Sequence, residues 1–201
     1  TFRASAKDFA HVGERAAMTD DIIALMVLRH YGVPTRLLDW SASPFVSSFF
    51  AADGHADSAA EIWAFDEPRY EIEGAKQWAV CPETTIGGTG HPAHFAAGLT
   101  AFLVEEPCDW FICAFYPAGF SRQLAQSGLY SMTARFGQDH AAHLARLLDE
   151  DHRHRYVLPA NLKSDGRKYL REKRGIWRGM LYPDSAGAAE TASHSFREPV
   201  S

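Results

Sequence analysis

The stretch HYGVPTRLLDWS, residues 30–41, carries ionisable and hydroxyl groups inside an apolar part of the chain. Arg36, Asp39 and Ser41 surround two leucines, directly behind one predicted helix and directly before another. A guanidinium at the mouth of a strand can make paired hydrogen bonds to a phosphate or a carboxylate. Arg36 therefore predicts an anion-binding position. The alternative is a structural ion pair between Arg36 and Asp39 beside the helix–strand corner.

A helix start follows this stretch directly. Ser41 directly follows the predicted strand, and Ser43-Pro44 opens the next helix. The unpaired N–H groups and the dipole of a helix N-terminus attract anions. The alternative is that Ser41 or Ser43 only caps the helix. The rings of Tyr31 and Trp40 suit stacking on a base or a nicotinamide, although most such rings belong to a core.

Other chemistry has weaker support in the sequence. The GGTG loop, residues 87–90, is followed by no Gly-Lys-Ser/Thr and lacks the full GxGxxG pattern. The sequence has no GxSxG elbow for a serine hydrolase. Histidines occur in three close pairs, but neither an HExxH motif nor a neighbouring cysteine completes a zinc set; the pairs are His91 and His94, His140 and His143, and His152 and His154. We expect no metal site.

Composition limits the class of protein. The 201 residues are 46% hydrophobic and 22% charged, which suits one compact domain with a substantial core. A net charge of −5 argues against a broadly basic nucleic-acid-binding protein but leaves room for a local basic cleft. We expect a cytoplasmic protein without a membrane partner, because no apolar stretch reaches the roughly 20 residues of a membrane helix and no signal peptide opens the chain. Three cysteines without CxxC spacing fit free thiols in a reducing compartment. The start at Thr1 rather than at a methionine is typical of a piece of a longer or trimmed chain.

Hydrophobic periodicity predicts short helices and strands that do not alternate strictly. Helices are expected at residues 19–31, 44–53, 138–150 and 163–174, and strands at 35–40, 62–65, 110–116, 129–133 and 156–158. Residues 122–126 are expected to be a short helical or irregular piece, and residues 68–107 show no clear pattern. This mixture predicts an α/β or α+β fold, a single domain with a mixed sheet and no repeats.

Three blocks together resemble the FRG-domain family. The first and longest is HYGVPTRLLDWSASPFVSSFFAA, residues 30–52; the others are RQLAQSGLYSM, residues 122–132, and KYLREKRGIWRGMLYP, residues 168–183. The resemblance implies an FRG-type domain over residues 1–185, its N-terminal part truncated, and a tail over 186–201. Arg29 stands where the family usually has Gln, and Ser41 where Thr is usual. The tripeptide Phe2-Arg3-Ala4 is the only stretch similar to Phe-Arg-Gly.

The order of these blocks is in turn similar to that of ADP-ribosyltransferases, which bind NAD in a cleft of a split mixed sheet. This fold-level similarity implies that Arg36 holds a phosphate or ribose, Ser41 sets the NAD-binding strand and Gln126 stands where the late catalytic Glu would be. The candidate catalytic residues are Arg36, Asp39, Ser41 and Gln126, and the candidate ligand-binding residues are His30, Tyr31, Thr35, Trp40 and Arg122.

Two functional hypotheses follow from the resemblance. The first is an NAD-dependent ADP-ribosyltransferase-like or NAD-glycohydrolase toxin or defence effector, with NAD as co-substrate, no metal, and an unknown protein or nucleic acid as substrate. The alternative is a non-catalytic module that binds a nucleotide or a partner and regulates an attached domain. Gln126 in place of a Glu favours the second, and polar residues clustered at a cleft beside residues 30–41 favour the first. The sequence specifies neither the substrate nor the oligomeric state.

Overall fold

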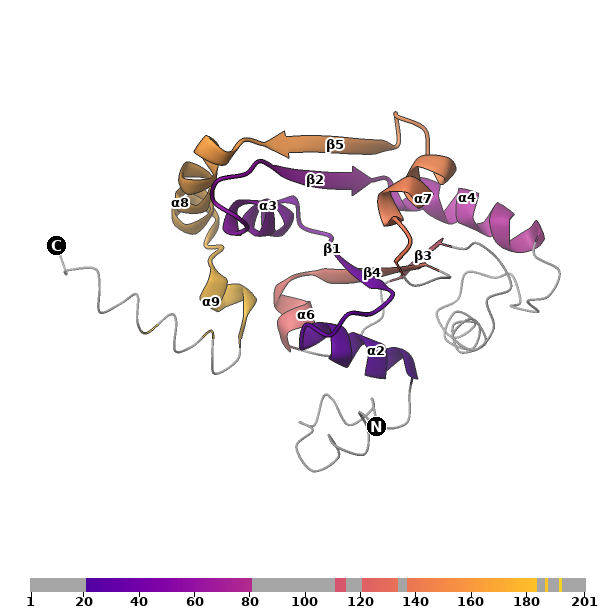
Figure 1. Ribbon diagram of the computed structural model, residues 1–201, viewed down its shortest axis with the longest axis horizontal. Coiled ribbons are helices and arrows are strands. Elements are labelled where there is room, and N and C mark those ends of the chain that lie inside the picture. The colour runs from indigo at the N-terminus through magenta and orange to yellow at the C-terminus, as the bar shows by residue number, and fades with distance from the viewer. Residues whose placement is uncertain are drawn as a thin grey trace, which may run out of the picture. The chain divides into compact units, whose positions relative to one another are not determined.

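The computed structural model describes residues 21–80, 111–114, 121–133 and 137–183, together with Gly187 and Ala192. They form helices and small sheets, which confirms the mixed fold class (Figure 1). The helices are α2 (Asp21–His30), α3 (Pro44–Asp53), α4 (Glu67–Val80), α6 (Ser121–Ala125), α7 (His140–Leu147), the 3-10 turn η2 (Ala160–Leu162), α8 (Lys163–Arg174) and α9 (Arg178–Leu181). The strands are β1 (Leu37–Ser41), β2 (Ala60–Phe65), β3 (Phe111–Ala114), β4 (Gly128–Thr133) and β5 (Arg153–Leu158).

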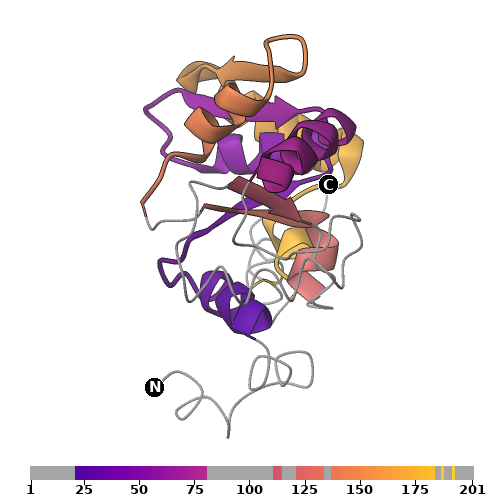
Figure 2. The same cartoon turned by 90° about the vertical axis from the view of Figure 1, so that its right-hand side faces the viewer.

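The described strands form two sheets. One has the strand order β1-β4-β3, and the other pairs β2 with β5, which lie side by side in both views (Figures 1 and 2). Strands β3 and β4 are antiparallel, with Phe111 opposite Thr133 and Ala114 opposite Tyr130. Successive residues of β4 are buried, whereas most of β5 is exposed. A strand buried on both faces is central to its layer, so β4 belongs to the core and β5 to the surface.

The contacts divide the chain into two compact units. The first unit contains residues 1–39, 64–118 and 130–154, and the second contains 40–63, 119–129 and 155–201. Each unit is therefore assembled from three separate stretches. The candidate residues fall into both: His30, Tyr31, Thr35, Arg36 and Asp39 belong to the first unit, and Trp40, Ser41, Arg122 and Gln126 to the second.

Most predicted elements are confirmed, with shifted ends. Helix α8 has the predicted bounds, and β1 begins two residues later than expected, so Thr35 and Arg36 precede it. Helix α7 is shorter than expected, because Asp139 caps its start and the chain is extended again at Leu148. Leu37 is 6% exposed and Leu38 36%, which confirms that successive side chains of this strand point to opposite faces.

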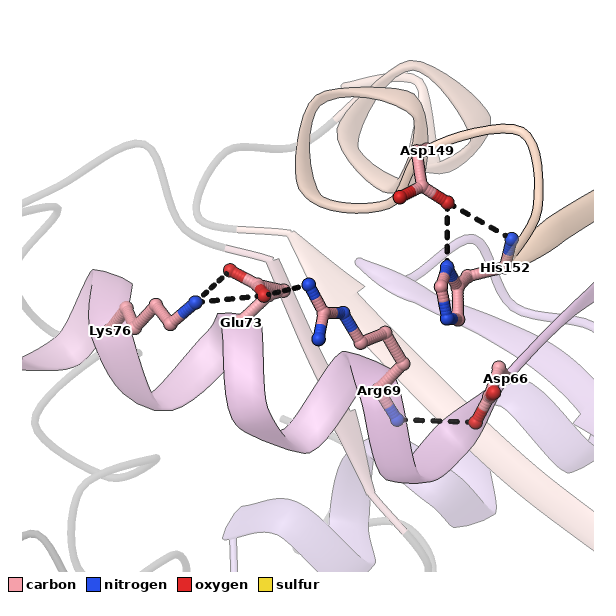
Figure 3. A network of polar contacts seen from close by, with 6 residues as sticks. All are labelled: Asp66, Arg69, Glu73, Lys76, Asp149 and His152. Carbon is pink, nitrogen blue, oxygen red and sulfur yellow. Dashed lines mark hydrogen bonds and ion pairs between the residues drawn. The ribbon is translucent and has the colours of Figure 1, made fainter.

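Helix α4 was not predicted, because apart from the buried Tyr70 the side-chain contacts described along it are polar. Its start is capped by Asp66, whose carboxylate accepts a hydrogen bond from the Arg69 N–H at 3.1 Å (Figure 3). Glu73 lies 2.9 Å from Arg69 and 2.8 Å from Lys76, at the spacings that face each other on a helix. The hydrogen bond from Lys76 holds the pKa of Glu73 below its ordinary value. Such pairs leave no trace in apolar periodicity, which is why residues 68–80 showed no clear pattern.

The start of α4 is also tied to the turn between α7 and β5. The Asp66 N–H donates to the His152 carbonyl at 2.9 Å. The His152 ring is in turn 2.6 Å from Asp149, which also accepts from the His152 N–H (Figure 3). The contact with His152 lowers the pKa of Asp149. This part of the first unit is thus held by a network of short-range polar contacts.

Helix α3 is the centre of the second unit. Its side chains Val46 and Phe49 form a buried cluster with three residues of the C-terminal block, and Tyr182 packs against it; the three are Leu170, Ile176 and Leu181. Along α8, Lys163 donates to the His55 carbonyl at 2.8 Å and Arg167 to the Ala52 carbonyl at 2.5 Å. The beginning of α8 therefore lies against the end of α3.

Leu181 offers a direct test of this core. It is 0% exposed, whereas its neighbour Met180 is 37% exposed. We expect Leu181→Ala to lower the free energy of unfolding by about 2–5 kcal/mol, because it removes buried methyl groups and leaves a cavity. Met180→Ala, the matched control, should change it by less than about 1 kcal/mol. Urea unfolding followed by circular dichroism measures both, and equal effects would contradict the assignment of Leu181 to the core.

Candidate functional site

The segment that carries Arg36 begins with a tightly defined helix end. Gly32 has a φ of +78°, in the left-handed region that favours glycine. Its N–H donates to the Arg29 carbonyl at 2.9 Å, and the Val33 N–H donates to the Leu28 carbonyl at 3.0 Å. These two bonds are the Schellman pattern, which ends α2. The following residues, 33–36, lead to β1 without regular secondary structure and include a bend at Arg36.

Thr35 and Arg36 lie immediately before β1 and are both half-buried. The Thr35 hydroxyl accepts a hydrogen bond from the Leu37 N–H at 3.2 Å, so its oxygen fixes the first residue of the strand. Of the aromatic residues predicted to stack on a ligand, Tyr31 is 61% exposed and Trp40 is half-buried. The side chain of His30 lies outside the described part of the structure. The ligand-binding role of these residues stays a prediction.

Asp39 pairs with a residue that the sequence marked only as a departure from the family pattern. Its Oδ2 is 2.6 Å from Nε of Arg29, at the end of α2. This ion pair joins the last turn of α2 to β1 across ten residues of chain. The partner that sequence reasoning proposed for Asp39 was Arg36. The pairing with Arg29 could not be read from spacing, because it depends on how the Gly32 turn brings the strand back to the helix.

In the second unit, Ser41 and Gln126 meet although 85 positions separate them. The Ser41 hydroxyl donates to the Gln126 carbonyl at 2.7 Å and accepts from the Ser43 N–H at 3.1 Å. A parallel contact runs beside it, from the Ala42 N–H to the Ser127 carbonyl at 2.9 Å. The structure therefore brings two of the four candidate catalytic residues together, through a side chain and a backbone carbonyl.

The neighbouring Ser43 is the cap of α3. Its hydroxyl accepts from the Val46 N–H at 3.4 Å, and Pro44 occupies the first position of the helix. The two serines thus divide the roles that the sequence left open. Ser43 caps the helix, and Ser41 fastens the strand end to the turn before β4.

The turn before β4 is closely packed. The Gln126 side-chain amide donates to the Leu181 carbonyl at 3.0 Å, and Ser127 has a positive φ of 47°. A Cβ on Gly128 would lie 3.1 Å from the Gln123 side chain, so the glycine permits this approach. The Arg122 guanidinium lies 4.5 Å from the centre of the Tyr182 ring, a cation–π contact. The block RQLAQSG therefore connects the corner before α3 to α9.

This arrangement limits the chemistry of Ser41 and Gln126 in the described conformation. The Ser41 proton is directed at a carbonyl oxygen, and no general base is involved in that bond. The Gln126 amide is directed at another carbonyl. The predicted common site that also includes Arg36 and Asp39 stays a prediction, since these two residues belong to the other unit.

The histidines of the first unit make polar contacts. Nδ1 of His140 is 2.7 Å from the hydroxyl of Ser131, and His143 contacts Arg146. Burial, reinforced by the nearby His143, lowers the pKa of His140 to about 4. Within the described residues, no three His, Cys, Asp or Glu side chains gather as metal ligands. The pair His91 and His94 and the GGTG loop lie outside the described residues.

The comparison with protein families supports the first of the sequence blocks. The family model of the FRG domain matches residues 1–60, a range that includes HYGVPTRLLDWS and the whole of α3. This match confirms the resemblance to the FRG-domain family. No curated protein and no solved structure matches the chain. Among the helices of the described ranges, none combines the length and apolar character that crossing a membrane requires.

The link between Ser41 and Gln126 predicts a loss of stability on mutation. Ser41→Ala removes a donor and an acceptor from a partly buried corner and should cost about 1–3 kcal/mol of unfolding free energy. Ser48→Ala is the control, because the Ser48 hydroxyl also donates to a backbone carbonyl, that of Pro44, but at an exposed position of α3. Ser41→Thr keeps the hydroxyl and should be close to wild type. Thermal melts of the three variants decide, and equal losses at Ser41 and Ser48 would contradict the special role of Ser41.

His140 predicts a pH dependence of stability. Its pKa is about 4 in the folded chain and 6.5 ordinarily, so the unfolded chain binds the additional proton between these values. The stability that the folded chain gains from keeping His140 neutral is fully present above pH 6.5 and is lost as the pH falls toward 4. We expect the wild type to lose more stability than His140→Gln across this window. Urea unfolding at a series of pH values measures the difference, and parallel curves would show that His140 does not titrate differently on folding.

Proposed function

We propose that this chain, whose residues 1–60 match the FRG domain, binds a phosphate-bearing nucleotide through the segment HYGVPTRLLDWS. NAD is the first ligand to test, Arg36 is the phosphate-binding residue, and Tyr31 supplies an exposed ring for stacking on a base or nicotinamide. In the reducing, cytoplasmic setting expected from the sequence, such a module binds a nucleotide, and this binding regulates an attached or partner protein.

The observation that carries this proposal is the place of Arg36, which is half-buried directly before the first residue of β1. Beside it, Arg29 and Asp39 form an ion pair at 2.6 Å. Asp39 is the carboxylate nearest to Arg36 along the chain, and Arg29 already supplies a cation to it. Asp39 therefore does not depend on Arg36 alone for a neighbouring cation. A guanidinium half-buried at the start of a strand remains well suited to a phosphate.

The geometry around Arg36 also favours binding without large rearrangement. The Gly32 turn and the bond from Leu37 to Thr35 fix the backbone on both sides of Arg36. Fixing a binding residue before the ligand arrives reduces the entropy lost on binding. The segment therefore has the character of a pre-organised binding loop.

A second candidate is NAD consumption, as in an ADP-ribosyltransferase-like or NAD-glycohydrolase toxin or defence effector acting on a protein or nucleic acid. The meeting of Ser41 with Gln126 favours it, because the similarity to ADP-ribosyltransferases required these distant residues to lie together. The Gln126 amide would have to leave the Leu181 carbonyl before it could orient a ribose. This requirement is why the binding module is the first candidate. Arg122, Trp40 and His30 enter either candidate as predicted ligand contacts.

Arg36→Ala tests the proposal. Removing a charge-assisted phosphate contact should weaken NAD binding by roughly 2–4 kcal/mol. The thermal melt should change little, because Arg36 is half-buried and is not a member of the buried core. Isothermal titration calorimetry with NAD, ADP and AMP measures the affinity. Arg69→Ala, on α4 of the same unit, is the control for losing one arginine and should bind like the wild type.

Three results would count against the proposal. The first is a wild type that binds none of the three nucleotides, and the second is an Arg36→Ala variant that binds them as tightly as the wild type. The third is an Arg36→Ala variant that melts far earlier, which would make Arg36 structural. Release of nicotinamide from NAD by the wild type would select the second candidate. In that case Gln126→Glu, which restores the acidic group at the late position, should raise the rate, and unchanged turnover would remove Gln126 from the catalytic set.

A further inference from the structure

Much of the positive charge of this acidic chain is concentrated in one stretch toward its C-terminus. Residues 153–178 hold nine Lys and Arg residues against two acidic ones, a net charge of +7, whereas the whole chain carries −5. Most of this charge is on α8 and the residues that follow it. A stretch of this kind creates a local positive potential that the overall charge conceals.

The basic residues of this stretch differ in how far they are buried. Lys163 is buried and bonded to the His55 carbonyl, and Arg178 pairs with Asp53 at 2.8 Å. The last turn of α8, by contrast, has exposed cations at Arg171, Lys173 and Arg174. This turn is the terminal part of α8 in Figure 1, before the chain continues to α9.

Aromatic rings accompany these cations. The Arg174 guanidinium is 4.3 Å from the centre of the Phe45 ring and 5.8 Å from that of Tyr169, and it donates to the Tyr169 hydroxyl at 3.2 Å. Both rings are exposed, Phe45 at 36% and Tyr169 at 48%. Lys173 follows Tyr169 by one helical turn and so lies on the same side of α8. Cations and exposed rings are therefore interleaved on one surface of the second unit.

We propose that this surface, the α8 patch formed by Phe45, Tyr169, Lys173 and Arg174, binds single-stranded nucleic acid. Its cations contact successive phosphates, and its rings stack with unpaired bases. The inference goes beyond the proposed nucleotide site and uses none of the residues in HYGVPTRLLDWS. It names a nucleic acid as a partner that the patch itself recognises.

Two features favour a single strand over other polyanions. Stacking needs bases that are not paired, and the patch offers two rings beside its cations. An anionic membrane would be bound by cations together with apolar side chains that insert between lipids. The exposed residues of α8 include no large aliphatic side chain, because Leu170 is buried. Cations in a last turn also offset the helix dipole, so the experiment must separate binding from stability.

The experiment measures fluorescence anisotropy of a labelled oligothymidylate of about 20 nucleotides, a length of one or two typical binding sites, over a range of salt concentrations. The double variant Lys173→Gln with Arg174→Gln should lower the slope of log affinity against log salt by about 1.4. The matched control is Arg69→Gln with Lys76→Gln on α4, which loses the same charge from exposed helical positions. That control should keep the wild-type slope.

The rings are tested separately. Tyr169→Ala should weaken binding about tenfold, whereas Tyr169→Phe, which keeps the ring, should bind as the wild type does. Thermal melts check that all variants are folded. A wild type that shows no salt-dependent binding, or a slope that falls equally in both double variants, would overturn the proposal. So would tighter binding of a duplex of equal length, or binding of phosphatidylserine vesicles without binding of the oligonucleotide. NAD titrations are independent of each of these outcomes, so the two proposals fail separately.

Discussion

Two consecutive hydrogen bonds link the three chain stretches of the second unit, residues 40–63, 119–129 and 155–201. The Ser41 hydroxyl donates to the Gln126 carbonyl, and the Gln126 amide donates to the Leu181 carbonyl. Both acceptors lie at or just past the end of a very short helix, where the last carbonyl groups have no partner inside the helix. Helices of four or five residues are unstable alone. The strand end before α3 therefore depends on α6 and α9, and they depend on it.

This dependence changes what the family resemblance explains. Within the blocks that carry the resemblance, Ser41, Gln126 and Gly128 each have a structural task in the described conformation. A match to such residues indicates the fold before it indicates a reaction. Function must then be argued from groups that take no part in the hydrogen bonds joining Ser41, Gln126 and Leu181. Arg36 and the exposed Tyr31 are such groups in one unit, and the α8 patch is one in the other.

The sequence predicted what local chemistry determines. Ser43-Pro44 and Gly54 marked both ends of α3, and Gly175, with a φ of +64°, marked the end of α8. The alternating burial of Leu37 and Leu38 followed from a strand at that place. Tertiary choices were beyond the sequence. It left open which serine caps α3, and it gave no sign that Arg29 would be the partner of Asp39. Helix α4 was not predicted because its side-chain pairs, Arg69 with Glu73 and Glu73 with Lys76, are charged and do not contribute to an apolar pattern.

Charge shows why an average property is a weak guide to a surface. The net charge of −5 argues against broad nucleic-acid binding, but it describes the electrostatic potential only at long range. At physiological salt, charges beyond a screening length of about 8 Å contribute little to a local contact. A phosphate close to the last turn of α8 responds to Arg171, Lys173 and Arg174 far more than to distant carboxylates. The same reasoning applies to Arg36, since the carboxylate nearest to it in sequence is already paired with Arg29. For both proposed sites, the charge close to the ligand is therefore the property to test, and the net charge of the chain is not.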